Sequence, residues 1–122
     1  MRKKVSPHFS VKEMSCPCCN VMGMENDVIK TIEEVRVKYG KPIRLTSAFR
    51  CPTHNQAVGG KNSSSHLAGL ALDISCGSSK ERYGLMRHLM QHFTRIGFGE
   101  NFIHVDLDHV NKVPNVIWDY YE

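Results

Sequence analysis

Residues 69–75 read Gly69-Leu-Ala-Leu-Asp-Ile-Ser75, and apolar and small or polar side chains alternate along this stretch. Successive side chains of a β-strand point to opposite faces of the sheet. One face of the expected strand therefore carries Leu70, Leu72 and Ile74. The opposite face carries Ala71, Asp73 and Ser75, so an ionisable group stands on the side away from the apolar residues.

Residues 102–108, Phe102-Ile-His-Val-Asp-Leu-Asp108, repeat this alternation. Ile103, Val105 and Leu107 form the apolar face, and His104, Asp106 and Asp108 share the opposite face with Phe102. If both apolar faces pack on helices, Asp73 and His104 emerge on the same open side of one antiparallel sheet.

Helices are expected in three places. Ser10 and Glu13 have the spacing of a capping box, residues 26–39 carry apolar side chains at helical spacing before Gly40, and a further helix begins after residues 77–79 and ends near Gly97. This last helix is expected to bury Leu85, Met86, Leu89, Met90 and Phe93.

The remaining chain supplies one more strand and a long loop. A strand is expected at residues 43–49, and an irregular loop rich in Gly, Asn and Ser at residues 51–65. The predicted fold is a single α+β domain over residues 1–122, with a small antiparallel sheet, helices on one face and an open zinc cleft on the other.

The polar residues of the two strands form a candidate metal site with the loop upstream. His66 precedes the first strand and can fold over the face that carries Asp73 and His104. Two imidazoles and one carboxylate suit Zn²⁺ and leave a fourth position for water, as in catalytic zinc sites. We therefore predict that His66, Asp73 and His104 bind one zinc ion.

These residues also carry a family resemblance. Residues 64–73, Ser64-Ser-His-Leu-Ala-Gly-Leu-Ala-Leu-Asp73, resemble the S-x-H-x-x-G-x-A-x-D motif of the zinc D-alanyl-D-alanine metallopeptidases, which share a fold with the hedgehog signalling domain. Residues 102–106 resemble the second motif of the branch in which the ligand histidine is followed by Val-Asp. Residues 45–55 with Gly59-Gly60 resemble its S-G-Y-R-S-P-x-x-N segment, and residues 9–13 resemble its opening.

The resemblance implies a zinc peptidase that cuts peptide bonds next to D-alanine in peptidoglycan, with the metal on His66, Asp73 and His104. It further implies that Arg50 holds the carboxylate or the carbonyl oxygen of the substrate, a task that suits a planar, permanently charged donor. The sequence departs from the family pattern at Ala48, where glycine is usual, and at Cys51, where serine is usual.

The general base is not fixed by the resemblance. Relatives often place Glu three residues before the second ligand histidine or His two residues before it, but Asn101 and Phe102 occupy those positions here. Asp106 shares the strand face of His104 and is our predicted base, with Glu100 as the rival.

The five cysteines are expected to be free thiols. Cys16 and Cys19 have the C-x-x-C spacing of a structural zinc site or a redox pair, together with Cys18, but no second half follows in the sequence. Cys51 and Cys76 are isolated, so a four-thiolate site would require distant segments to converge.

Composition excludes several classes of protein. The apolar stretches are too short for a transmembrane helix, and the segment after Met1–Lys4 lacks the apolar run of a secretory signal. The net charge of +4 is modest and spread along the chain, so nucleic acid is not an expected partner. We expect a monomeric enzyme that remains in the cytoplasm until it is released to the cell wall.

The predicted function is zinc-dependent hydrolysis of peptidoglycan peptides, as carboxypeptidase or endopeptidase, by a lytic enzyme (endolysin) of phage or prophage type. One alternative is a non-catalytic, zinc-dependent binding module of the same fold. A second is a metal module in which the cysteines hold the ion and the positive charge binds nucleic acid.

Overall fold

The computed structural model describes residues 3–110 and 112–121, so Met1 and Arg2 of the segment searched for an export signal lie outside it. The helices are α1 (Val11–Met14), α2 (Asn26–Tyr39), α3 (Pro52–Ala57) and α4 (Ser79–His92). The strands are β1 (Lys4–Ser6), β2 (Phe9–Ser10), β3 (Leu45–Ser47), β4 (Ala71–Ser75), β5 (Arg95–Phe98), β6 (Phe102–Asp106) and β7 (Val116–Asp119).

Five of the strands form one mixed sheet in the order β3-β4-β6-β5-β7. All neighbours pair antiparallel except β5 and β7, which are parallel. β1 and β2 form a separate two-stranded sheet. The α+β class is thus confirmed, and β7 adds in parallel to the antiparallel strands of the larger sheet.

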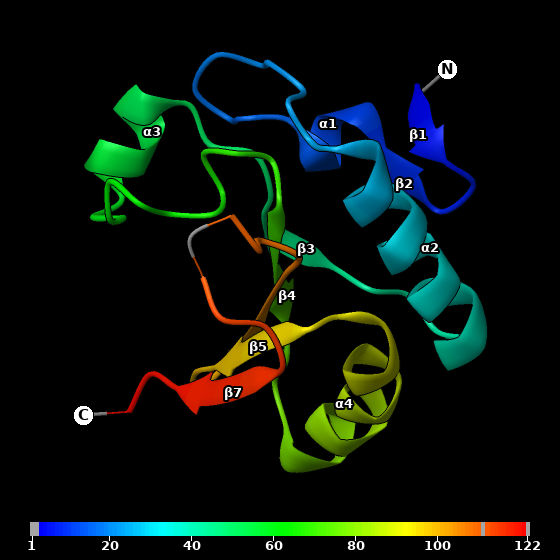
Figure 1. Ribbon diagram of the computed structural model, residues 1–122. Helices are drawn as coiled ribbons and strands as arrows, with labels where there is room; N and C mark the ends of the chain where they lie inside the picture. Colours follow the sequence, from blue (N-terminus) through cyan, green and yellow to red (C-terminus); the bar gives the residue numbers. More distant parts are fainter. Residues whose placement is uncertain (1–2, 111, 122) are drawn as a thin grey trace.

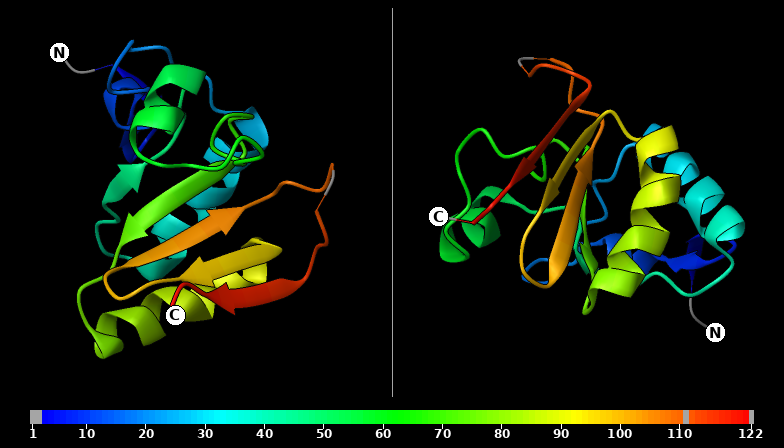
Figure 2. Two further views of the ribbon diagram at one scale, coloured as in Figure 1. Left: turned by 90° about the vertical axis from the view of Figure 1, so that its left-hand side faces the viewer. Right: turned by 90° about the horizontal axis from the view of Figure 1, so that it is seen from below.

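The two long helices cover one face of the five-stranded sheet. α2 and α4 lie side by side on this face, whereas α3 and the loop after it lie on the opposite side (Figures 1 and 2). Side chains from both layers form the core between them, among them Ile32, Leu72, Leu89, Ile103 and Val105, all fully buried. Burying this apolar surface supplies most of the favourable free energy of folding.

The helix starts follow the sequence signals. The Ser10 hydroxyl accepts a hydrogen bond from the Glu13 amide at the start of α1, and the Ser78 hydroxyl accepts one from the Glu81 amide at the start of α4. Gly40 ends α2 in the left-handed conformation, with φ 75°.

The expected end of α4 near Gly97 is wrong. The helix stops at His92, the backbone is extended at Phe93, and Arg95–Phe98 is strand β5, which pairs with β6. Met90, expected in the core, is 57% exposed. Gly97 lies within β5, and Gly99 begins the turn to β6, where its amide donates to the Phe102 carbonyl.

The loop at residues 51–65 is not wholly irregular, because α3 occupies Pro52–Ala57. Pro52 stands in the first turn, where a helix tolerates proline. No helix in the described part of the chain combines the length and the hydropathy that a bilayer span needs.

Candidate metal centre and cavity

Asp73 and His104 are brought together by the pairing of β4 with β6. The register places Asp73 directly opposite His104. Nδ1 of His104 lies 3.0 Å from Oδ1 of Asp73, and Nε2 of His66 lies 3.2 Å from the same oxygen. His66, Asp73 and His104, the metal triad, thus present one ligand atom each, all within 4.8 Å of one another.

His66 reaches the triad from a turn upstream of β4. Gly69 allows this turn, because its φ of 72° suits glycine and a Cβ there would collide with the Gly23 carbonyl. The turn is tied to the segment that follows β3, since the Arg50 amide donates to the His66 carbonyl. Both imidazoles of the triad are buried.

The other ring nitrogen of each histidine has a hydrogen-bond acceptor. Nδ1 of His66 lies 2.7 Å from the Ala48 carbonyl oxygen, and a carbonyl can only accept, so the ring donates there and leaves Nε2 as a lone pair toward Asp73. Nε2 of His104 lies 2.8 Å from Oδ2 of Asp106. Metal-binding histidines ordinarily have such acceptors, which fix the tautomer and the ring orientation.

The Asp73 carboxylate is suited to a metal. Its burial opposes ionisation, but the rings of His104 and His66, when they are protonated and donate to it, hold the pKa of Asp73 well below its ordinary value. It is therefore an anion at neutral pH, next to two imidazole nitrogens. This donor set fits Zn²⁺ with an open fourth position.

Asp106 contacts the triad from the far side of the His104 ring. Its side chain is 1% exposed, and Oδ1 accepts from the Asp108 amide and lies 2.9 Å from Nε of Arg95. With Oδ2 at the His104 ring, both carboxylate oxygens have partners. This geometry favours a role in orienting His104 over the role of base that the sequence suggested.

Arg50 lies beside the triad. Its guanidinium donates to the Ser47 hydroxyl, to the Asn55 side-chain oxygen and to Oδ2 of Asp73, the last at 3.4 Å. Because α3 supplies Asn55, the helix in the loop helps to hold Arg50 over Asp73.

A cavity of about 390 Å³ opens over the triad. Its basic side chains are Arg50, Lys61, Arg95 and Lys112, and its aromatic wall is formed by Phe102, Trp118 and Tyr120. Asp73 and Asp106 are the carboxylates that line it among the residues the structure describes, whereas Glu100, the rival base, is exposed and lies outside the lining.

Trp118 was missed by the sequence analysis. It comes from β7, whose parallel register sets it beside Gly97, and a Cβ at Gly97 would lie 2.5 Å from the indole. The indole packs near the His104 ring, with centroids 5.7 Å apart, and under the Arg95 guanidinium. The short β-branched and aromatic run at residues 116–119 was the available signal for this strand.

Comparison with known proteins agrees with the geometry. A family model described as peptidase M15 matches residues 7–106, which is most of the chain. The chain belongs to this family, that of the zinc D-alanyl-D-alanine metallopeptidases. No curated protein matches the sequence.

Family membership supports metallopeptidase activity, a metal dependence that is typically on zinc, and a peptide as substrate. The match includes all three residues of the metal triad as well as Arg50 and Asp106.

Proposed function

We propose that this protein is a zinc metallopeptidase that hydrolyses peptide bonds beside D-alanine in peptidoglycan. The observation that carries the proposal is the convergence of the metal triad on a cavity that Arg50 also lines. The chemistry that zinc supplies in such a site is polarisation of the scissile carbonyl and activation of water. A lytic role of phage or prophage type is part of the proposal.

Arg50 is proposed to bind substrate. Three of its N–H groups have partners in Ser47, Asn55 and Asp73, and a guanidinium has five, so two remain for a carboxylate or a carbonyl oxygen. Lys61 and Lys112 add positive charge around the cavity. Peptidoglycan stem peptides carry carboxylates, so this positive lining complements them.

Asp106 is proposed as a positioning residue that acts through His104. Its carboxylate fixes the ring so that Nδ1 faces Asp73, and its negative charge makes the imidazole a stronger ligand. Arg95 holds the Asp106 carboxylate from the other side.

A second candidate function is a non-catalytic, zinc-dependent binding module. It is favoured by the lining of the cavity, because neither Asp73 nor Asp106 is free to accept a proton from water and no other carboxylate lines the cavity within the described ranges. Such a module would bind the same peptides without cleaving them.

Two synthetic substrates test the proposal and separate its two forms. One is a stem peptide that ends in D-Ala-D-Ala, and the other is a cross-linked dimer of stem peptides. Release of free D-alanine from the first indicates a carboxypeptidase, and separation of the dimer indicates an endopeptidase. Zinc-dependent binding of both peptides without cleavage would establish the binding module instead.

A further inference from the structure

Four cysteines from two distant segments converge on the side of the molecule where α3 lies. Cys16, Cys18 and Cys19 come from the connection between α1 and α2, and Cys51 comes immediately before α3. Their sulfur atoms all lie within 4.8 Å of one another. We propose that this cysteine cluster is a second metal site, in which four thiolates bind a structural Zn²⁺.

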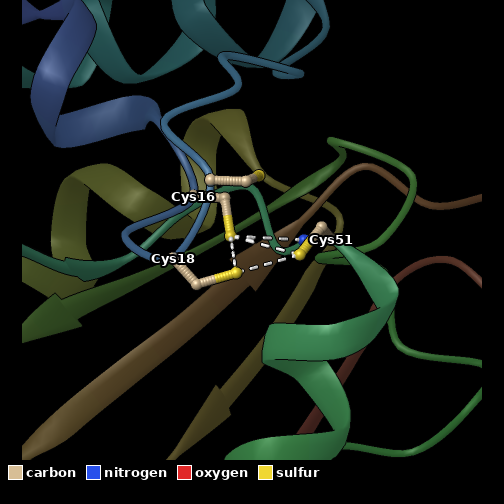
Figure 3. A group of neighbouring side chains, drawn as sticks. Cys16, Cys18 and Cys51 are labelled. Atoms are coloured by element: carbon tan, nitrogen blue, oxygen red, sulfur yellow. Dashed lines mark hydrogen bonds between the residues drawn. The ribbon is translucent and has the colours of Figure 1, made fainter.

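The sulfur spacing fits a shared metal ion. The Sγ atoms of Cys16, Cys18 and Cys51 are separated by 3.2 to 3.6 Å (Figure 3). Zn–S bonds of about 2.3 Å in a tetrahedron place neighbouring sulfurs about 3.8 Å apart. A disulfide would need about 2.05 Å, and all five cysteines are free.

The backbone is shaped to gather the sulfurs. The Cys16 amide donates to the Val21 carbonyl, and the Asn20 amide donates to the Cys16 carbonyl, which closes a tight loop around Cys18 and Cys19. Asn20 takes the left-handed conformation, with φ 62°, to complete this loop. The loop thus presents three thiols to one point, as a structural zinc loop does.

Amide groups also point at the sulfur atoms. The Cys51 amide donates to Sγ of Cys16, and the His54 amide donates to Sγ of Cys51. A bound thiolate is negatively charged and gains from such N–H donors. Cys16 is fully buried, whereas Cys18 and Cys19 are exposed and leave a path for the ion.

A metal here has a structural task. Residues 15–25 contain no helix or strand, and a small domain gains stability when a metal joins segments that are far apart in sequence. The ion would join this connection to Cys51, the residue next to Arg50. Free thiols were expected because Cys51 is 32 residues from Cys19 in the sequence, and only the tertiary structure shows that they meet.

Metal content of the full chain, purified under reducing conditions, tests the proposal. We expect two zinc ions per chain in the parent and one in His104→Ala, which removes a ligand of the other site. Cys51→Ser and Cys18→Ser should each lose the second ion, while the control Cys76→Ala, which changes a cysteine outside the cluster, should keep both. Retention of both ions in Cys18→Ser and Cys51→Ser would overturn the proposal.

Cobalt substitution gives a readout that does not depend on folding of the cysteine variants. Co²⁺ bound to His104→Ala protein should show the sulfur-to-metal charge-transfer and visible bands of a tetrahedral tetrathiolate. Absence of these bands, or a mass that shows an internal disulfide in protein isolated without reductant, would contradict the site. Since His104→Ala has no intact metal triad, this result is independent of the proposed peptidase activity.

Discussion

Nδ1 of His104 lies 3.0 Å from Oδ1 of Asp73, across a pair of antiparallel strands in which these two residues face each other directly. β4 and β6 are inner strands of the sheet, and each is paired with a neighbour on both sides. A metal ligand set built on paired strands is held more rigidly than one built on loops. His66, on a turn, completes the set through its hydrogen bond to Ala48.

Removal of His104 should remove the metal from the triad. His104→Ala leaves only His66 and Asp73 as protein ligands, and two ligands hold Zn²⁺ far more weakly than three. The measurement is the zinc content per chain, determined by elemental mass spectrometry. It should be one ion lower in the variant than in the parent, whatever the cysteine cluster holds. A zinc content equal to that of the parent would show that the assignment of the metal triad is wrong.

Arg50 should matter for substrate and not for metal. Arg50→Ala should keep zinc and fold but lower kcat/KM by roughly 10²- to 10³-fold, the usual effect of losing a donor to a reacting oxygen. Arg50→Lys should restore little, because one ammonium cannot replace the planar fork. Arg44→Ala, which changes an exposed arginine near β3, is the matched control. Full activity of the lysine variant would reduce the role of Arg50 to charge alone.

Asp106→Asn distinguishes a positioning residue from a base. If Asp106 orients His104, the variant should bind zinc about 10- to 100-fold more weakly, and excess zinc should recover much of the activity. If Asp106 is the base, zinc affinity should be unchanged and the rate should fall by about 10²- to 10⁴-fold whatever the zinc concentration. Glu100→Gln, an exposed change outside the cavity, should resemble the parent.

Asp108 should contribute stability that depends on pH. Burial of its carboxyl opposes ionisation, but the Ser65 hydroxyl, the Val110 amide and Lys112 lower the pKa of Asp108. Because the pKa in the folded state is below that in the unfolded state, this stability is present above the unfolded pKa of about 3.9. It is lost as the pH falls through the folded value.

The comparison is chemical denaturation of Asp108→Asn and the parent across this range. At pH 7 the variant should be less stable by about 1 to 3 kcal/mol, the usual cost of losing a hydrogen bond to a charged group. The difference should shrink as the pH falls below about 4. A stability difference between the variant and the parent that does not vary with pH would show that the charge of Asp108 is not the source of its stabilising effect.

Strand periodicity allowed much of the site to be predicted from sequence. A period of two residues places Asp73 on one face of its strand and His104 on one face of its own, and the apolar faces leave only one side open. The register that sets these two residues opposite each other is a property of the folded sheet. Sequence alone could not predict it.

Features that depend on distant contacts were not predicted. Trp118 reaches the cavity because β7 adds in parallel to β5, and nothing in four residues of sequence specifies that partner. The convergence of Cys51 with Cys16 likewise depends on how two loops pack. Asp106 was placed on the correct strand face, but its contacts with His104 and Arg95, which bear on its role, are visible only in the structure.

The most direct test of the proposed zinc peptidase activity is a digest of purified peptidoglycan by the parent protein, analysed by mass spectrometry with and without a chelator. We expect new peptide ends at D-alanine, loss of these products with chelator, recovery on addition of Zn²⁺, and no products from His104→Ala. Peptidoglycan that remains intact with zinc-loaded protein, or cleavage that persists in His104→Ala, would contradict this proposal.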